Sequence, residues 1–316
     1  MSTEVTNAPL RRAHAAGAAA SPPAYAGEVP MTEAEFERIC TILFKHCAIS
    51  LKAGKEGLVR SRLARHLRRL GLRSYTEYLE AVERDTTGRE HSEMIDSLTT
   101  NKTSFYREGA HFEYLQGTVL PKLFDMKPTR TGAFPARESV RIWSAGCSSG
   151  EEPYTLAMLL HELVRDPAQR GARILATDLS SKVLAMARAA TYAEPAIAEL
   201  PWHDASRYFA RVDGGAQPLV KVRDHVRSLV RFARLNLMEE WPMERGFQVI
   251  MCRNVMIYFD KDVQARLVDR FWEMLAPGGH LFVGHSESLT SLKHRFSYVQ
   301  PAVYVKGNAP GRVSVM

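Results

Sequence analysis

The sequence predicts an α/β protein in which a small all-helical domain precedes a larger domain built on a mostly parallel β-sheet. Two observations lead to this prediction. Apolar residues recur at helical spacing over residues 31–105, and strand-like and helix-like segments alternate from Val140 onward. Such alternation is typical of a sheet that helices cover on both faces. We therefore expect a helical domain at residues 31–105, a linker helix and loop at 106–139, and the α/β domain at 140–310.

Helix signals follow one another closely in the N-terminal part of the chain. Residues 1–30 are rich in alanine and proline and are expected to form a disordered arm. Thr32 and Glu35 then form a capping-box pattern, and Gly71 is placed to end the second helix. Later helices are expected at residues 56–70, 74–84, 89–99 and 109–126, before a loop at 127–139. The side chains expected to be buried are Phe36, Ile39, Cys40, Leu43 and Phe44 in the first helix and Leu58, Leu63, Leu67 and Leu70 in the second.

The second domain alternates between strands and helices except in one stretch. Residues 191–228 break the pattern and predict an inserted β-subdomain, with an antiparallel hairpin formed by residues 207–211 and 219–223. A Pro-Gly-Gly turn at residues 276–279 is expected to lead into the last strands. The other strands are expected at residues 140–145, 172–177, 228–237, 247–254, 280–285 and 299–306, and the helices at 151–164, 181–190 and 261–275.

Length and composition narrow the functional classes. The 316 residues are 45% hydrophobic and 24% charged, as in ordinary globular proteins. We find no apolar run of about 18 residues that predicts a membrane span, and no secretory signal pattern, so we expect a cytoplasmic protein. The four cysteines form no CxxC pair and no zinc-ligand cluster, so we expect reduced cysteines and no metal. The net charge of +7 favours an acidic partner.

Polar residues that follow the strands predict a cofactor site, because ligands of such sheets bind outside the carboxyl ends of the strands. The first strand leads into the small residues 144–150 and then into Glu151 and Glu152 at a helix start. The loop lacks the GxGxxG fingerprint, and two acidic residues there would repel a pyrophosphate. A cationic cofactor without phosphate, such as S-adenosylmethionine, fits better. The alternative is that both glutamates only complement the helix dipole.

The next strands add further candidates. Asp178 follows the second strand and is placed to accept hydrogen bonds from ribose hydroxyls, unless it only caps the following helix. Asn236 and Leu237 follow a later strand, where the amide could read an adenine edge that the leucine covers. Competing motifs fail. Residues 284–288 have the outline of a nucleophile elbow but end in Ser288 instead of glycine, and the sequence has neither a Walker loop nor an HExxH pattern.

Four motifs establish a resemblance to a known family. They are TTNKTSFYRE at residues 99–108, WSAGCSSGEEPY at 143–154, CRNVMIYFD at 252–260 and GHSE at 284–287. In order and spacing they closely resemble the bacterial chemotaxis receptor methyltransferases of the CheR type, over residues 31–307. The resemblance implies a Rossmann-like class I methyltransferase domain, which transfers a methyl group from S-adenosylmethionine to receptor glutamates and releases S-adenosylhomocysteine.

The resemblance also implies which residues contact the cofactor. It includes the segment between the domains, which the residues alone would assign to a polar linker, and it does not decide between Glu151 and Glu152. The implied contacts are Asn101, Thr103, Arg107, Glu151, Glu152, Asp178, Asn236, Leu237, Arg253 and Asn254.

The expected reaction requires little acid–base catalysis. A glutamate side chain has a reference pKa of about 4.3, so it is already a nucleophilic carboxylate at neutral pH. We expect the enzyme to align the reactants and to exclude water. Arg107, Arg253 and Tyr258 are candidates for orienting the incoming carboxylate.

Two surfaces are candidates for receptor binding. The second helix carries arginines with no acidic residue among positions 58–70, and their mutual repulsion would be relieved by an acidic partner such as a receptor methylation helix. A solvated polar face is the alternative. The inserted hairpin could bind a receptor C-terminal peptide by strand addition, unless it is only a structural insert. The arginines expected to dock the receptor are Arg60, Arg62, Arg65 and Arg69.

Two other functions compete with receptor methylation. The fold and the basic helix would also suit a nucleic-acid methyltransferase, although the Asn-Pro-Pro-Tyr and Pro-Cys motifs of such enzymes are absent. An S-adenosylmethionine-binding signalling module without turnover is the second alternative. We expect a monomer that binds no nucleic acid and does not insert into the membrane.

Overall fold

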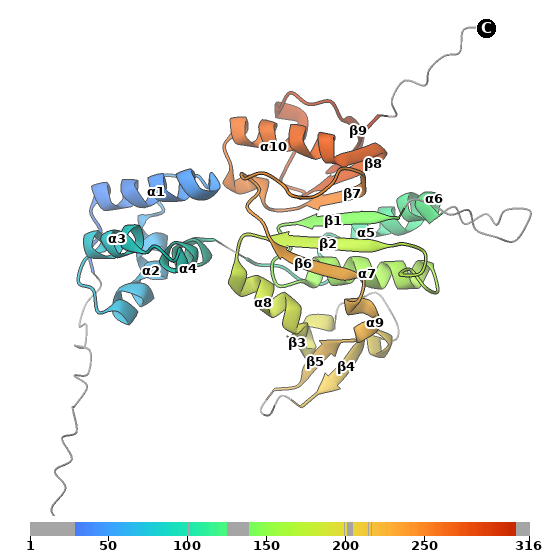
Figure 1. The fold of residues 1–316 in the computed structure, drawn as a ribbon, viewed down its shortest axis with the longest axis horizontal. Coiled ribbons are helices and arrows are strands. Elements are labelled where there is room, and N and C mark those ends of the chain that lie inside the picture. Colours follow the sequence, from blue (N-terminus) through green and yellow to red (C-terminus); the bar gives the residue numbers. More distant parts are fainter. Residues whose placement is uncertain are drawn as a thin grey trace, which may run out of the picture.

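The computed structural model describes residues 29–99, 101–124, 139–198, 200, 205–213, 215 and 217–307. These residues form a helical N-terminal domain beside an α/β domain, which confirms the predicted fold class (Figure 1). Most of the expected arm and of the expected loop at residues 127–139 lies outside the described residues. Among the described helices, none is long and apolar enough to cross a membrane.

The N-terminal domain consists of four helices, whose ends follow the predicted signals. Thr32 and Glu35 form the expected capping box, in which each side chain accepts a hydrogen bond from the backbone of the other residue. Gly71 has φ +69° and ends the second helix in the left-handed conformation that suits glycine. The helices are α1 (Glu33–Cys47), α2 (Glu56–Leu70), α3 (Tyr75–Arg84) and α4 (Arg89–Leu98).

The buried faces of α1 and α2 differ in part from the prediction. Val59, Leu63 and Leu67 are buried in α2, but Leu58 is 40% exposed. In α1, Phe44 is 48% exposed. Residues three and four positions apart can belong to either of two adjacent faces, so spacing alone does not decide which one meets the core.

The linker contains a helical run that changes its winding. The prediction of one helix over residues 109–126 is wrong in detail, because a π-helical segment, Leu115–Val119, separates α5 (Gly109–Tyr114) from α6 (Leu120–Phe124). The buried side chains of this run belong to the same apolar cluster as those of α7 (Glu151–Leu163). The linker helices therefore belong to the α/β domain by packing.

The α/β domain is built on a seven-stranded sheet in the order β6-β2-β1-β7-β8-β10-β9. The first five strands of this order run parallel to one another. β10 is antiparallel to β8, and β9 is antiparallel to β10. The strands are β1 (Arg141–Ala145), β2 (Arg173–Asp178), β6 (Val230–Arg234), β7 (Phe247–Cys252), β8 (Leu275–Val283), β9 (Ser297–Gln300) and β10 (Val303–Val305).

Helices cover both faces of this sheet. Ile142 of β1 packs in the cluster that contains α7, whereas its neighbour Trp143 packs on the opposite face with α10 (Lys261–Met274). This alternation follows from the two-residue period of a strand. The remaining helices of the domain are α8 (Ser181–Ala189) and α9 (Asp224–Arg227), and short 3-10 turns lie at Glu194–Ile197, Ala205–Arg207, Met256–Tyr258 and Leu289–Ser291.

The inserted β-subdomain has one strand more than predicted. The expected hairpin is present as β4 (Phe209–Val212) and β5 (Leu219–Val222), which pair in antiparallel fashion. β3 (Thr191–Ala193) pairs with the other edge of β5, so the small sheet has the order β3-β5-β4. A three-residue strand carries too little alternation to be detected in the sequence.

Two predictions near the C-terminal end of the sheet are wrong. Residues 276–279 are not a free turn but part of β8, which pairs with β7 on both sides of a register shift. The single strand expected at residues 299–306 is two strands, β9 and β10, joined by a turn in which Ala302 has φ +62°. The first outcome depends on pairing with β7, which lies far earlier in the sequence, whereas in the second β9 and β10 pair with each other across a short turn.

The helical domain lies against the carboxyl edge of the sheet. The Asn236 side-chain amide, just after β6, donates a hydrogen bond to the backbone carbonyl of His46 at 2.6 Å. The backbone N–H of Ser50 donates to the carbonyl of Tyr258 at 2.9 Å. Phe259 packs against the core of the helical domain. These contacts bring residues of both domains to the edge of the sheet where ligands bind.

We predict that Leu63→Ala lowers the free energy of unfolding of the helical domain by about 3 kcal/mol, because Leu63 is fully buried and its truncation leaves a cavity. Leu58→Ala is the matched control, and it should change this free energy by less than about 0.5 kcal/mol. Urea denaturation followed by circular dichroism measures both. Equal losses for the two variants would contradict the observed burial of α2.

Candidate active site

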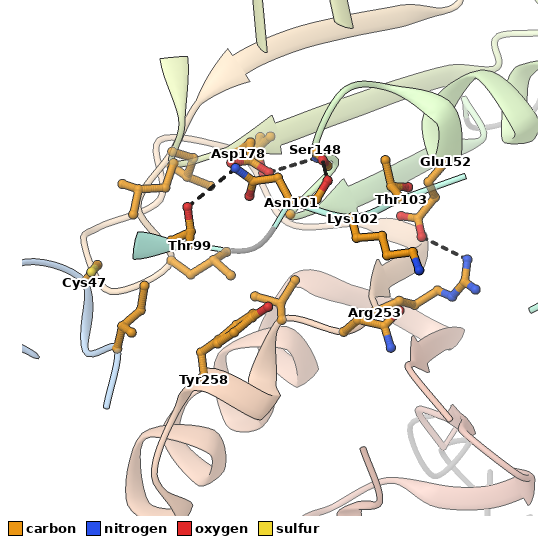
Figure 2. Close-up of a pocket in the computed structure, with 18 of the residues that line it drawn as sticks. Cys47, Thr99, Asn101, Lys102, Thr103, Ser148, Glu152, Asp178, Arg253 and Tyr258 are labelled. Carbon is orange, nitrogen blue, oxygen red and sulfur yellow. Dashed lines mark hydrogen bonds and ion pairs between the residues drawn. The ribbon is translucent and has the colours of Figure 1, made fainter. Parts of the chain in front are cut away.

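A pocket opens at the carboxyl edge of the sheet, between the two domains (Figure 2). The helical domain contributes Cys47 and Ile49, and the α/β domain contributes the residues that follow β1, β2, β6 and β7. The segment that connects the domains forms another wall through residue 99 and several of residues 101–107. All of the predicted cofactor residues except Glu151 line this pocket, namely Asn101, Thr103, Arg107, Glu152, Asp178, Asn236, Leu237, Arg253 and Asn254.

Glu151 and Glu152 point in different directions, although both begin α7. The Glu152 carboxylate lines the pocket, accepts a hydrogen bond from Ser144 Oγ at 2.7 Å and pairs with Arg253. Glu151 instead accepts a hydrogen bond from Ser149 Oγ at 2.7 Å and is absent from the pocket wall. The structure thus favours Glu152 over Glu151 as the residue that faces the pocket. Successive helical residues project about 100° apart, so only one of the two can face the pocket.

The turn between β1 and α7 is shaped by glycine and bound to the end of β2. Gly146 has φ +86°, and a Cβ atom there would lie 2.4 Å from a methyl carbon of Val255. The backbone N–H of Ser148 donates to the Asp178 carboxylate at 2.8 Å, and Ser148 Oγ donates to the Asn101 carbonyl at 2.9 Å. One serine thus connects the turn, β2 and the interdomain segment.

Asp178 is a pocket residue and not the cap of the following helix. The N-cap of α8 is Ser180, whose hydroxyl accepts from the backbone N–H of Val183. The Asp178 carboxylate accepts backbone hydrogen bonds from Ser148 and Ser180, and burial raises its pKa above the ordinary value. Each carboxylate oxygen can accept a further hydrogen bond, because a carboxylate has about four acceptor positions.

Arg253 lies between two carboxylates beside the pocket. Its side chain is 2% exposed, and its guanidinium nitrogens lie 3.0 Å from Glu108 and 3.0 Å from Glu152. It also donates to the backbone carbonyl of Arg107. Burial raises the pKa of Glu152, although Arg253 opposes the shift. Within this cluster two carboxylates face one guanidinium, which places a local negative charge beside the pocket.

These contacts change the roles of three predicted residues. Arg253 is held by two carboxylates and a carbonyl, so it is a poor candidate for orienting a substrate. Both ends of the Asn236 amide are engaged within the chain, since it also accepts from the backbone N–H of Met238 at 3.0 Å. The predicted reading of an adenine edge by this amide is therefore not supported. Leu237 is 8% exposed and forms an apolar part of the wall.

Glu287 of the GHSE motif is a structural residue of the site that residue patterns alone did not assign. Glu287 is 6% exposed. Its carboxylate accepts backbone hydrogen bonds from Gly284 at 2.6 Å, Asn254 at 2.7 Å and Ile257 at 3.1 Å. It thereby holds the loop after β7, in which Asn254 has φ +59°. Asn254 and Ile257 lie about thirty positions earlier in the chain, and nothing in their spacing indicates the contact.

Two clusters of side chains resemble metal sites only in proximity. Glu108, His111 and His285 have potential ligand atoms within 4.8 Å of one another, but Glu108 is already paired with Arg253. Burial lowers the pKa of His111 to about 4. The second cluster combines His66 with Glu90 and Glu93, which pair with Arg69. The spacing rules behind the expectation of no metal do not detect clusters of this kind, because their members come from separate segments.

Comparisons with known proteins identify both domains. Residues 34–99 match the model of the CheR methyltransferase all-alpha domain, and residues 101–305 match that of the CheR methyltransferase SAM binding domain. The boundary between the two matches falls in the segment that lines the pocket.

Bacterial proteins named as chemotaxis protein methyltransferases are similar to this chain over most of its length. The chain is 39% identical over 264 residues to a probable chemotaxis protein methyltransferase of Rhizobium etli. This match covers 83% of this chain and 96% of the relative. It is 37% identical over 280 residues to the chemotaxis protein methyltransferase of Borreliella burgdorferi, with 88% and 96% covered. It is 37% identical over 275 residues to that of Escherichia coli, with 87% and 91% covered.

The geometry predicts how ligand binding in this pocket depends on pH. A carboxylate with a raised pKa takes up a proton at higher pH than usual, so the affinity for S-adenosylhomocysteine should fall on acidification from neutral pH, and the fall should begin above the usual glutamate range. Glu152→Gln should weaken binding roughly tenfold at neutral pH and flatten this dependence. Isothermal calorimetry measures both effects. The control is Glu151→Gln, and an equal loss in that variant would contradict the assignment of Glu152.

Proposed function

The chain belongs to the CheR family of methyltransferases, and we propose that it transfers a methyl group from S-adenosylmethionine to glutamate side chains of chemoreceptors. It is an S-adenosylmethionine-dependent chemotaxis methyltransferase. The choice of glutamate rests on the family resemblance and on the chemistry of the pocket. The observation that carries the proposal is the pocket at the sheet edge, where Glu152, paired with Arg253, and Asp178 lie on one wall.

The pocket residues fit this cofactor. Glu152 and its excess negative charge suit the ammonium and sulfonium groups, and Asp178 has acceptor positions for ribose hydroxyls. Leu237 and Ile49 supply apolar surface for a purine ring. When bound, the cofactor supplies an electrophilic methyl group on a positively charged sulfur.

The transfer balances without a proton donor or acceptor. A carboxylate oxygen of the receptor glutamate forms a bond to the methyl carbon, the carbon–sulfur bond breaks, and its electron pair stays on sulfur. The chain contributes alignment and exclusion of water, since the attacking carboxylate is already ionised at neutral pH. Arg107 and Tyr258 line the pocket, which keeps both as candidates for orienting the carboxylate.

The basic surface of α2 remains our proposal for receptor docking, but its membership changes. The predicted Arg62 donates to the Leu98 carbonyl at 2.9 Å, and Arg65 donates to Ser97 Oγ at 2.7 Å. Arg69 pairs with two glutamates of α4, so the charges of α2 do have partners inside the chain. Glu56 also lies one turn before the predicted Arg60. The argument from unrelieved repulsion is therefore wrong.

The exposed arginines at the end of α2 are better placed to attract a receptor. Arg68 contacts a carbonyl of its own helix, and Arg73 lies just beyond the C-cap. These two cations would attract an acidic receptor surface and so speed the association of enzyme and receptor.

We predict that Arg68→Ala combined with Arg73→Ala lowers the rate of receptor methylation about threefold to tenfold at low ionic strength, and that the difference shrinks at about 0.5 M salt. Initial rates with receptor-containing membranes measure this. The affinity for S-adenosylhomocysteine serves as the control and should not change. A rate equal to that of the unaltered enzyme at low salt would remove this end of α2 from the docking surface.

The inserted β-subdomain is our proposal for a second receptor contact. β5 is paired on both sides, whereas β4 has one side without a strand partner among the described residues. Such an edge can bind an extended peptide through backbone hydrogen bonds. Calorimetry with a peptide from a receptor C-terminus measures this contact. The monomeric state and the cytoplasmic location are likewise proposals, to be checked by light scattering and by cell fractionation.

One assay separates the proposed function from its alternatives. With tritiated S-adenosylmethionine and receptor membranes, we expect label that is released as methanol by mild alkali, because methyl esters of glutamate hydrolyse there. Label in RNA or DNA that resists alkali would indicate a nucleic-acid methyltransferase. Tight cofactor binding without transfer to either acceptor would indicate a signalling module.

A further inference from the structure

The receptor carboxylate must enter a pocket that already contains two acidic side chains. Glu152 and Asp178 both line the wall, and a third negative group is repelled unless a cation receives it. The cations of the wall are Lys102, Arg107 and Arg253. The contacts that each makes within the chain decide which of them is available.

The guanidinium groups of Arg253 and Arg107 both have partners within the chain. Arg253 is 2% exposed and its charge is balanced by Glu108 and Glu152. Arg107 donates to the carbonyl of Lys102 at 2.7 Å, which ties its guanidinium to the interdomain segment. The family resemblance assigns Arg107 to the cofactor.

Lys102 combines a fixed backbone with an uncommitted side chain. Its carbonyl accepts from Arg107, and the preceding carbonyl of Asn101 accepts from Ser148 Oγ at 2.9 Å. Its side chain is exposed and makes no hydrogen bond or ion pair with any described residue. Figure 2 shows it extending along the pocket toward Glu152 and Arg253. A flexible four-carbon stem lets the ammonium follow an entering group.

We propose that Lys102 binds the carboxylate of the receptor glutamate and thereby helps to determine specificity for a carboxylate over the neutral amide of glutamine. This inference rests on the proposed function of the same pocket. The cofactor also has a carboxylate, so the chemistry that Lys102 recognises could come from either molecule. Separate measurements of receptor and cofactor binding distinguish the two sources.

The test compares Lys102→Met with Lys102→Arg and with Lys122→Met. Lys122 is an exposed lysine of α6, which Figure 1 shows at the end of the α/β domain opposite the helical domain, and it does not line the pocket, so its replacement removes the same charge elsewhere. We expect Lys102→Met to raise the KM for receptor about tenfold, because a charge-assisted hydrogen bond is lost. Lys102→Arg should stay within about threefold of the unaltered enzyme, and Lys122→Met should not change KM.

Two further measurements separate recognition from a structural role. The affinity for S-adenosylhomocysteine and the melting temperature should be unchanged in Lys102→Met. A receptor with glutamine at the methylated positions should inhibit the unaltered enzyme poorly, and Lys102→Met should narrow the difference between the glutamate and glutamine forms.

Three results would overturn the inference. An unchanged receptor KM in Lys102→Met with normal formation of methyl esters would remove Lys102 while leaving the proposed function intact. Weaker binding of S-adenosylhomocysteine in that variant would assign the lysine to the cofactor instead. No alkali-labile label from the unaltered enzyme would reject the proposed function itself, and the inference with it.

Discussion

The buried ion cluster of Arg253, Glu108 and Glu152 is the constraint on which the site depends. Arg253 directly follows β7, Glu108 directly precedes α5, and Glu152 lies in α7, so their pairing fixes three separate parts of the chain against one another. A buried charge without a partner costs several kcal/mol, so each member requires the others. The cluster also places a local negative charge at this part of the pocket, because one guanidinium faces two carboxylates. That imbalance explains why a cationic cofactor without phosphate suits this sheet edge.

Backbone contacts extend this constraint to the rest of the pocket. Glu287 holds the loop after β7 through three N–H groups, and Ser148 connects the β1–α7 turn with Asp178 and Asn101. Asn236 then joins the sheet to the helical domain through His46. Most polar side chains around the pocket therefore serve the chain as well as the ligand. Among the cations of the wall, Lys102 differs in that its side chain pairs with no described residue, so its ammonium group is available to a ligand.

The sequence predicted those features that depend on local pattern. The strand and helix alternation, the capping box at Thr32 and the left-handed Gly71 follow from neighbouring residues, and all are observed. The choice between Glu151 and Glu152 could not be made, because it depends on the direction in which α7 leaves Gly150. The partners of Arg65 and Arg69 could not be seen either, since they lie on α4. The interdomain segment entered the site only through the family resemblance, because its residues look like a polar linker.

The buried charges of Arg253, Glu108 and Glu152 also bear on the survival of the protein in a cell, because the two carboxylates outnumber the one guanidinium. A folded chain that buries unneutralised charge has a smaller margin against unfolding than one whose charge is balanced. A ligand that binds only the folded state adds to that margin in proportion to the logarithm of its concentration relative to its dissociation constant. The lifetime of this protein in a cell would then increase with the concentration of the methyl donor. Cells depleted of the donor would lose the protein to proteolysis sooner.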